Sequence, residues 1–310
     1  MARKRRGRPV NGWVVLDKPA GMSSAQAVAR VRHVFDAAKA GHGGTLDPEA
    51  TGVLPVALGE ATKTVSWVMD GRKSYRFTVR WGEARATDDG EGAIIATSDV
   101  RPGRADILAV LSRFTGTIEQ VPPDFSAIKV DGQRAYRLAR AEVAVDLAPR
   151  RVVVERLELA EMPDADHAVF EVVCGKGTYM RSLARDMAVA LGTVGHVARL
   201  RRTACGPFSE EQSISLDKLG SLGHSAPPSG CLLAVETALD DIPALALNAA
   251  QADHLKHGRP VRVAGPGGLR FVDIGNLADG AMLCAMADGR PVALARFEQG
   301  EIRPVRVLNI

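Results

Sequence analysis

The stretch GHGGTLDPEATGVLPVALGEATK, residues 41–63, is rich in glycine and small apolar residues. A single carboxylate, Asp47, lies in it directly before Pro48. Proline fixes its own φ and restricts the residue before it, so the backbone around this carboxylate is restrained. An aspartate before a proline is also a common turn residue, and composition alone favours that structural role. The residues around Asp47 do not by themselves decide between a turn and a chemical role.

The composition of the 310-residue chain is that of a folded globular protein, with 46% hydrophobic and 25% charged residues. This length allows one large domain and one small domain, each with its own core. The net charge of +4 hints at an anionic partner. We expect no membrane span, because no run of about 18 apolar residues occurs. The cysteines, none in a C-x-x-C pair, favour reduced thiols in the cytoplasm: Cys174, Cys205, Cys231 and Cys284.

The chain begins with the basic sequence MARKRRGRP. We expect residues 1–10 to form a flexible basic arm. Such an arm is either a solvated tail or a contact for RNA phosphates, and the sequence favours neither.

Hydrophobic periodicity predicts a mixture of strands and helices. Residues 12–21 form a short strand ending in a turn, and residues 23–35 form a helix capped by Ser23 or Ser24. Residues 75–81 alternate between large apolar and polar side chains, which predicts a half-buried strand.

Further along, residues 105–114 predict a helix, and residues 121–142 predict a proline-broken loop followed by a basic helix. Residues 168–174 predict a strand that passes through a Gly-Lys-Gly turn into a helix. Residues 220–230 predict a surface loop. Beyond about residue 245, short strands separated by Gly/Pro turns predict a small all-β barrel.

Several known chemistries are not supported by the motifs. The sequence CGKGT is not a P-loop, because Phe170 and Gly177 occupy positions that require glycine and Ser/Thr. No G-x-G-x-x-G, H-E-x-x-H, Cys/His cluster or G-x-S-x-G elbow occurs. We therefore expect no metal, no nucleotide cofactor and no other cofactor.

Residues 41–63 resemble the signature of the TruB family, the tRNA pseudouridine-55 synthases, in which G-H-x-G-T-L-D-P-x-A-T-G carries the catalytic aspartate. Further family blocks follow in order between residues 11 and 208. They are GWVVLDKPAGMSS, KSYRFTVRWGE, VPPDFSAIKVDGQRAYRLAR, CGKGTYMRSLARDMAVALG and HVARLRRTACGPF. The ending GRPVALARFEQGEIRPVRVLN is similar to the small RNA-binding β-barrel called PUA.

The resemblance implies roles for particular residues. Asp47 matches the catalytic aspartate, Tyr75 the active-site tyrosine and Arg181 the active-site arginine. Leu200 matches the position that packs near the base. The chain departs from the family pattern T-D-T-x-D, because Arg85 and Ala86 replace Thr and Asp. The last aspartate of that pattern remains as Asp89, and the resemblance implies that it joins an arginine–aspartate network with Asp47 and Arg181.

The resemblance also implies a fold and a domain division. We expect a pseudouridine synthase fold of the mixed α/β (α+β) class, with a central, mainly antiparallel sheet flanked by helices. The catalytic domain would span residues 11–245, with an RNA-contacting insertion at about 121–150. A PUA-like RNA-binding domain would span residues 246–310. The family suggests a monomer whose partner is the T arm of tRNA.

The implied reaction explains the solitary carboxylate. Pseudouridine formation breaks the N1–C1′ bond, turns the base and joins C5 to C1′, so positive charge develops at the anomeric carbon as in a glycosidase. One carboxylate suffices, because the base itself returns and no water has to be delivered. Asp47 must stay ionised, with Arg181 as its partner and Asp89 holding Arg181. Tyr75 is expected to stack on the base, and its hydroxyl is a candidate for proton removal. Attack of Asp47 on C1′ and a glycal route both remain open.

The target uridine lies in a folded RNA arm and must be flipped out. His42 resembles the family histidine that replaces it in the stack. A cluster of basic residues is expected to contact phosphates: Lys129, Arg134, Arg137, Arg199, Arg201 and Arg202. Lys18 and Lys63 are open between structural and RNA-contacting roles. Two alternatives remain, a non-catalytic RNA-binding or RNA-folding protein and a synthase acting on ribosomal RNA.

Overall fold

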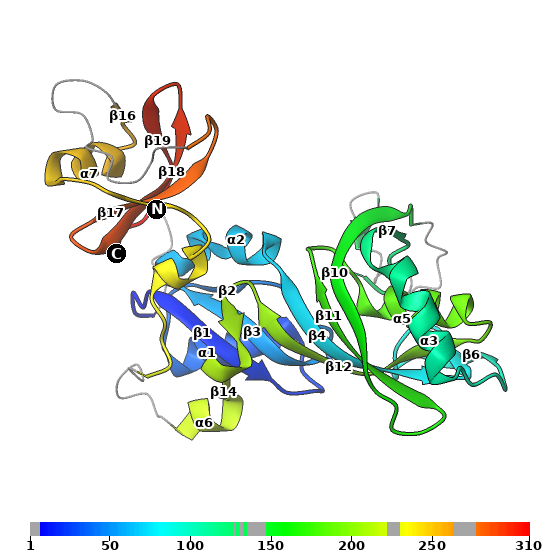
Figure 1. Ribbon diagram of the computed structural model, residues 1–310. Coiled ribbons are helices and arrows are strands. Elements are labelled where there is room, and N and C mark those ends of the chain that lie inside the picture. Colours follow the sequence, from blue (N-terminus) through cyan, green and yellow to red (C-terminus); the bar gives the residue numbers. More distant parts are fainter. Residues whose placement is uncertain (1–6, 127, 131–132, 135–146, 222–229, 263–276) are drawn as a thin grey trace.

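In the computed structural model, the described residues are 7–126, 128–130, 133–134, 147–221, 230–262 and 277–310. The main body is built on one ten-stranded sheet (Figure 1). Its strand order is β14 (Ile214–Ser215), β1 (Gly12–Lys18), β3 (Thr51–Leu58), β12 (Gly195–Cys205), β4 (Lys73–Trp81), β11 (His167–Cys174), β10 (Arg150–Glu161) and β7 (Gly116–Gln120), with β2 (Ala40–His42) on β3 and β13 (Phe208–Ser209) on β12. Only the pairs β1–β14 and β3–β12 are parallel among these strands. The expected mixed, mainly antiparallel sheet is confirmed.

Helices cover this sheet and join its strands. They are α1 (Ser24–Val34), α2 (Val65–Asp70), α3 (Arg104–Val110), α5 (Met180–Ala190) and α6 (Leu216–Ser221), with short 3₁₀ turns η1 (Gly59–Lys63), η2 (Leu111–Phe114), η3 (Glu210–Gln212) and η4 (Val235–Leu239). Two small hairpins complete the body, β5 (Glu83–Arg85) with β6 (Ile94–Thr97) and β8 (Lys129–Val130) with β9 (Gln133–Arg134).

The predicted elements at the start of the chain are confirmed. Helix α1 begins after Ser23, whose hydroxyl accepts from the backbone N–H of Gln26 while the Gln26 side chain accepts from the N–H of Ser23. Its buried face carries Ala27 and Val31, and Phe35 packs just beyond its end. In β4, Phe77 and its apolar neighbours are buried as the alternation predicts.

The body has two cores on the sheet. One lies where α5 packs on β4, β10 and β11, and the other where α1 packs on β1 and β3. Tyr75 and Leu200 contact both cores, so they lie where the two halves of the sheet meet. Strands β4 and β12, which carry these two residues, therefore lie at the centre of the sheet, and the predicted unit of strand, tight turn and helix over β11 and α5 forms one of its halves.

Residues 1–6 and the predicted basic helix within 135–146 lie outside the described residues, as does most of the predicted loop at 220–230. The expectation of a flexible arm over residues 1–10 is wrong for its last part. Arg8 pairs with Ala37 through backbone hydrogen bonds, and Val10 is buried in the core under α1. These residues therefore belong to the folded body.

The second sheet follows η4 and lies beside α2 (Figure 1). Its order is β15 (Ala244–Ala246), β17 (Met282–Ala287), β18 (Arg290–Glu298), β19 (Glu301–Val307) and β16 (Val261–Arg262). Helix α7 (Ala249–Lys256) packs on it, with Leu255 fully buried. The sequence predicted an all-β barrel; the described residues form a curled five-stranded sheet with one helix. No helix among the described residues is long and apolar enough to cross a membrane.

Candidate active site

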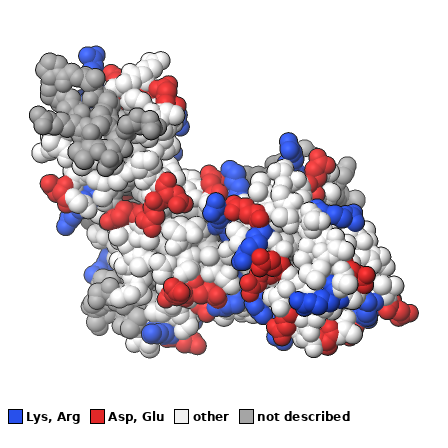
Figure 2. Space-filling view, in the orientation of Figure 1, with Lys and Arg blue, Asp and Glu red and all other residues white. Residues whose placement is uncertain are grey.

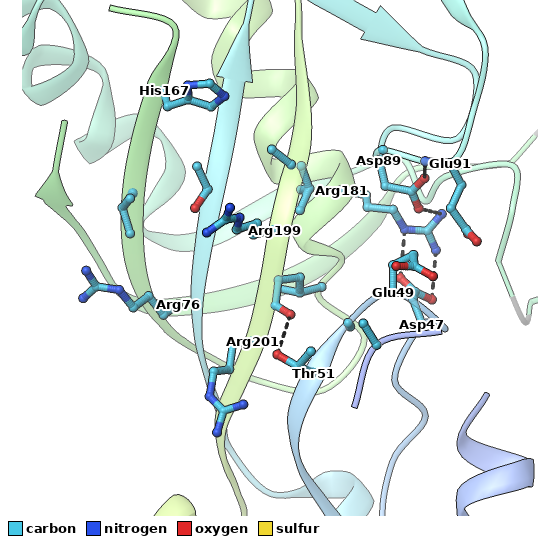
Figure 3. Close-up of a pocket in the computed structure, with 18 of the residues that line it drawn as sticks. Asp47, Glu49, Thr51, Arg76, Asp89, Glu91, His167, Arg181, Arg199 and Arg201 are labelled. Atoms are coloured by element: carbon cyan, nitrogen blue, oxygen red, sulfur yellow. Dashed lines mark hydrogen bonds and ion pairs between the residues drawn. The ribbon is translucent and has the colours of Figure 1, made fainter. Parts of the chain in front are cut away.

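A cleft of about 950 Å³ crosses the open face of the central sheet (Figure 3). Strands β3, β4, β11 and β12 supply its floor, and the loops that carry Asp47 and Asp89 form one end with Arg181. The cleft therefore brings together residues from positions 47, 89 and 181, which are far apart in the sequence.

The loop that carries Asp47 is fixed on both sides of the carboxylate. On one side, the Ser24 hydroxyl donates to the Leu46 carbonyl at 2.9 Å and accepts from the Leu46 N–H at 2.8 Å. On the other side, the buried ammonium of Lys18 donates to the carbonyl of Pro48 at 2.8 Å. It also donates to the carbonyls of Pro19 and Met22. Lys18, left open by the sequence, thus has a structural role in this loop.

Arg181 forms a two-pronged ion pair with Asp47 (Figure 3). Its Nε lies 3.0 Å from one carboxylate oxygen and Nη2 lies 3.2 Å from the other. The guanidinium is only 5% exposed and also donates to the backbone carbonyls of Thr87 at 3.1 Å and Phe125 at 2.9 Å. Four interactions therefore fix its plane, and the paired fork orients the carboxylate.

Asp89 approaches the same guanidinium from another side, 3.7 Å from Nη1. Its carboxylate accepts from the Thr87 hydroxyl and from the Glu91 N–H at 3.1 Å. The loop is closed by Arg85, which donates to the carbonyls of Gly90 and Gly92. Arg85, at the position of the departure, therefore closes the loop that carries Asp89.

Burial raises the pKa of Asp47 above its usual value, and the charge and hydrogen bonds of Arg181 oppose that shift without cancelling it. The negative charge of Asp89 adds to the rise. The sequence led us to expect a carboxylate held in its charged form by Arg181. The structure contains this partner but also a desolvated site, so the pKa of Asp47 lies above that of an ordinary aspartate.

Leu200 lines the cleft, whereas Tyr75 is not among its lining residues. Tyr75 is half-buried and packs with Leu200 against both cores. Burial raises the pKa of Tyr75 to about 12, although Arg202 opposes this shift. The phenol is therefore neutral at physiological pH, which disfavours a phenolate as the group that removes a proton.

The expectation that Arg202 contacts phosphate is wrong for this structure. Arg202 is 1% exposed. It donates to the carbonyls of Val53 at 2.8 Å, Gly44 at 3.0 Å and Thr45 at 3.4 Å. A buried guanidinium with these acceptors supports the loop of residues 41–63 from behind and cannot reach a ligand in the cleft.

The other predicted RNA contacts have different positions. Arg199 is exposed in the cleft and has no ion-pair partner within the described parts of the chain. Arg201 also lines the cleft but pairs with Asp17 at 3.0 Å and with Glu210. Lys129 and Arg134 lie in the β8–β9 hairpin, where only the backbone is described, and Arg137 lies outside the described residues.

His42 ends strand β2 and is half-buried, but it is not among the residues that line the cleft. Its Nδ1 is buried, with no hydrogen-bond partner among the described residues. Burial, aided by the charge of Arg202, lowers the pKa of His42, so the imidazole is neutral at physiological pH.

Comparison with known proteins assigns the chain to a family. Residues 32–180 match "TruB family pseudouridylate synthase (N terminal domain)", and residues 181–240 match "tRNA pseudouridylate synthase B C-terminal domain". The chain is 55% identical to tRNA pseudouridine synthase B of Rhodospirillum rubrum, over 100% of both chains. The chain belongs to the TruB family. It is also 56% identical to the Gluconacetobacter diazotrophicus protein of that name, over 99% of this chain and 100% of the relative.

Solved structures share the fold of this TruB-family chain. "Crystal Structure of a Cbf5-Nop10-Gar1 Complex" has a TM-score of 0.72 at 26% identity, covering 96% of this chain and 84% of the other. "Structure of H/ACA RNP bound to a substrate RNA containing 2'-deoxyuridine" has a TM-score of 0.74 at 24% identity, covering 100% and 92%. At 24% identity, the similarity to the second structure shows a shared fold alone.

Several charged cleft residues of this TruB-family chain were not predicted from the sequence, among them Arg76, Glu49 and Glu91. Arg76 lines the cleft and pairs with Glu171 at 2.8 Å and Glu161 at 3.1 Å. Glu49 and Glu91 lie at the Asp47 end. Arg76 could have been found, because the alternation of residues 75–81 places it on the polar face of a strand beside Tyr75.

Proposed function

We propose that this chain converts uridine 55 in the T loop of tRNA to pseudouridine, acting as a monomer in the cytoplasm, without a metal or cofactor. The observation that carries the proposal is the ion pair between Asp47 and Arg181 in the cleft of a TruB-family fold. Asp47 is the nucleophile or electrostatic stabiliser in this scheme, and Arg181, Asp89 and Tyr75 assist it.

The reaction rearranges bonds within one nucleotide. The N1–C1′ bond breaks, with its electron pair going to the base, and positive charge develops at C1′. The carboxylate of Asp47 stabilises that centre, by attack on C1′ or by taking the 2′ proton. The base then turns and C5 bonds to C1′, as the Asp47–C1′ bond breaks on the first route or the 2′ proton returns to the sugar on the second, and the proton on C5 then leaves to restore aromaticity. The product is an isomer of the substrate.

The surrounding side chains support separate requirements of this reaction. Arg181 keeps the desolvated Asp47 in one orientation, and Asp89 balances the charge of Arg181 at 3.7 Å. Tyr75 stacks on the detached base after a local movement that exposes its ring. Its raised pKa supports this stacking role better than direct proton removal.

RNA recognition uses basic residues on the floor of the cleft and the PUA-like domain. Arg199 is the exposed cleft arginine best placed to bind a phosphate, and Arg201 contributes after leaving its carboxylate partners. His42 fills the gap left by the flipped uridine as a neutral ring. The catalytic domain ends at about residue 245, and the PUA-like domain from 246 to 310 supplies further RNA contacts.

The test is tritium release from an unmodified tRNA transcript carrying C5-labelled uridine. We expect one tritium per tRNA, mapping to the T-loop uridine, and no release by Asp47→Asn, which keeps the side-chain shape. Asp70→Asn is the matched control, because Asp70 is an exposed carboxylate paired with Lys176 at the surface. Release by Asp47→Asn would remove Asp47 from its role. Tight tRNA binding without release by any protein would favour the non-catalytic alternative.

A further inference from the structure

Helix α5 carries a second arginine one turn after Arg181. Arg185 lies four positions further along, so the two side chains share a face of the helix. Both contact the loop between β5 and β6, which carries Asp89 and begins where the chain departs from the family pattern at Arg85 and Ala86. Arg181 lines the cleft, whereas Arg185 is not among the described residues that line it. Contact with a substrate therefore does not explain the second arginine.

Arg185 is held by acceptors on three sides. Its Nη1 lies 2.8 Å from Oδ2 of Asp88, and its Nε lies 3.0 Å from Oδ1 of Asp186. Its Nη2 donates at 2.9 Å to the Val121 carbonyl, which also accepts from the Ser182 hydroxyl at 2.7 Å. The side chains of Arg185 and Asp88 are 30% and 17% exposed. Their ion pair is therefore partly shielded from water, which makes it stronger than a pair on an open surface.

Asp88 lies between the two loop residues that contact Arg181. The Thr87 carbonyl accepts from Nη1 of Arg181 at 3.1 Å, and the Asp89 carboxylate lies 3.7 Å from the same nitrogen. Three successive loop residues thus meet two arginines that are one turn apart on α5. Because Thr87 and Asp89 are the covalent neighbours of Asp88, a displacement of Asp88 displaces groups that hold Arg181.

The backbone of Asp88 is in the left-handed region, with a φ of 57°. Aspartate and asparagine tolerate this conformation better than most other residues that carry a side chain. The Asp88 N–H donates to the Arg85 carbonyl at 3.0 Å, and the Asp88 carbonyl accepts from the Val197 N–H at 3.0 Å. The main chain thus joins the loop to β12, and the ion pair with Arg185 joins the same residue to α5, the helix that carries Arg181.

We propose that Arg185 and Asp88 are a positioning pair, which holds the loop on α5 and so fixes the plane of the Arg181 guanidinium. This inference rests on the proposed function, since Arg181 in turn orients Asp47. A misplacement of about 1 Å caused by a mutation far from the reacting atoms can lower a rate about 10²-fold. Loss of the pair therefore lowers the rate of the chemical step, while RNA affinity stays unchanged because neither side chain is among the described residues of the cleft.

The experiment removes the pair from each side and compares it with a similar arginine elsewhere. Arg185→Met removes all the contacts of the guanidinium. Asp88→Asn removes the charge of the loop residue alone and keeps a side chain that tolerates the left-handed backbone. The matched control is Arg101→Met, because Arg101 is 34% exposed, pairs with Asp166 and donates to two main-chain carbonyls. Three quantities are measured: single-turnover tritium release at saturating enzyme, the Kd for tRNA, and Tm.

We expect Arg185→Met to lower the single-turnover rate about 10–100-fold. Its Kd for tRNA should stay within about twofold of wild type, and its Tm should fall by about 2–4 °C. Asp88→Asn should lower the rate about threefold to tenfold, because a neutral amide oxygen still accepts from Arg185 but binds it less strongly. Arg101→Met should show a similar loss of Tm with a rate within about twofold of wild type. Equal rate losses in Arg101→Met and Arg185→Met would assign the effect to general stability and overturn the inference, as would a rate for Arg185→Met within about threefold of wild type.

A double variant tests whether Arg185 acts through Arg181. In the Arg181→Met background, Arg185→Met should lower the rate by no more than about twofold, since the group that the pair positions is already absent. Multiplication of the two rate losses would overturn the inference. The combined loss of Tm should likewise be smaller than the sum of the single losses, and additive losses would count against the coupling. Because Tm needs no catalysis, this comparison still decides the inference if wild type releases no tritium, an outcome that would contradict the proposed function.

Discussion

Replacing Arg181 by methionine is the most direct perturbation of the candidate site. The change leaves Asp47 and Asp89 without their shared cation and removes donors from two carbonyls. Removing one partner of a buried ion pair costs about 3–5 kcal/mol. Because the Asp47 side chain is 37% exposed and can regain water, we expect the lower end, about 3 kcal/mol. For a protein of this size that lowers Tm by about 6–12 °C.

Expressed as free energies, the loss of reaction rate in Arg181→Met should exceed the loss of fold stability. Arg181→Met loses the charge that orients the carboxylate in the transition state, and a loss of about 10³-fold in the single-turnover rate is expected. Arg181→Lys keeps the positive charge but loses the two-pronged hydrogen bonding. Its single-turnover rate should therefore lie between those of wild type and Arg181→Met. Tritium release and thermal unfolding followed by circular dichroism measure both effects.

A second substitution separates the two consequences. Asp89→Asn in the Arg181→Met background removes one of the uncompensated charges, so it should recover part of the lost Tm without recovering the rate. A single variant Arg181→Met with Tm within 1 °C of wild type, or a rate within about threefold, would contradict the reasoning from the ion pair.

Three further predictions address individual side chains. Since burial raises the pKa of Asp47 and only the ionised form is active, activity should fall as pH decreases through a value above the usual 3.8; the acidic limb of a single-turnover pH profile should move higher still in Arg181→Lys, and a limb at or below 3.8 would contradict the desolvation argument. Tyr75→Phe should keep the rate within about threefold and Tyr75→Leu should lower it about 10²-fold, because a neutral ring is needed for stacking; equal losses in single-turnover assays would implicate the hydroxyl instead. Arg199→Gln should lower the slope of log Kd against log salt by about one, whereas Arg202→Gln should leave that slope unchanged and cost about 2–4 kcal/mol of stability in denaturant titrations; the reverse pattern would restore Arg202 as an RNA contact.

Local patterns predicted much of the fold, because each signal depended on neighbours in the sequence. The cap expected at Ser23 or Ser24 is provided by Ser23, and the alternation of residues 75–81 formed as expected. The strand-turn-helix unit whose helix begins at Met180 also formed as expected. Helix α7 was not predicted. It has only eight residues, too few for a clear helical repeat of apolar side chains, and its capping residue Asn248 directly follows a stretch that resembles a strand. The convergence of Asp47, Asp89 and Arg181 came from family resemblance, because no local rule places residues 134 positions apart side by side.

The wrong predictions concerned which arginine side chains are buried. In HVARLRRTACGPF, Arg199, Arg201 and Arg202 look alike in sequence, yet they are exposed, ion-paired and buried respectively. The pairing with β4 is regular from Arg199 to Arg202, so Arg199 and Arg201 face the cleft and Arg202 faces the opposite side of the sheet. The fate of each guanidinium depends on partners such as Asp17 and the Gly44 carbonyl, which lie on other strands and loops. Side-chain partners across a sheet are the information that a single sequence lacks.

The charges in the cleft are separated in space, and this separation bears on how RNA can enter. Figure 3 shows Glu49 and Glu91 beside Asp47 at one end, with Arg76, Arg199 and Arg201 on the floor away from it. Over the face in Figure 2, acidic and basic side chains are interspersed. In the cleft, Arg76 and Arg201 already have carboxylate partners. A phosphate at the acidic end would be repelled by several carboxylates, whereas an uncharged base would not. Under the proposed function, the RNA phosphates would therefore lie over the arginines and a single extruded base would reach Asp47, which is the arrangement that isomerisation within one nucleotide requires.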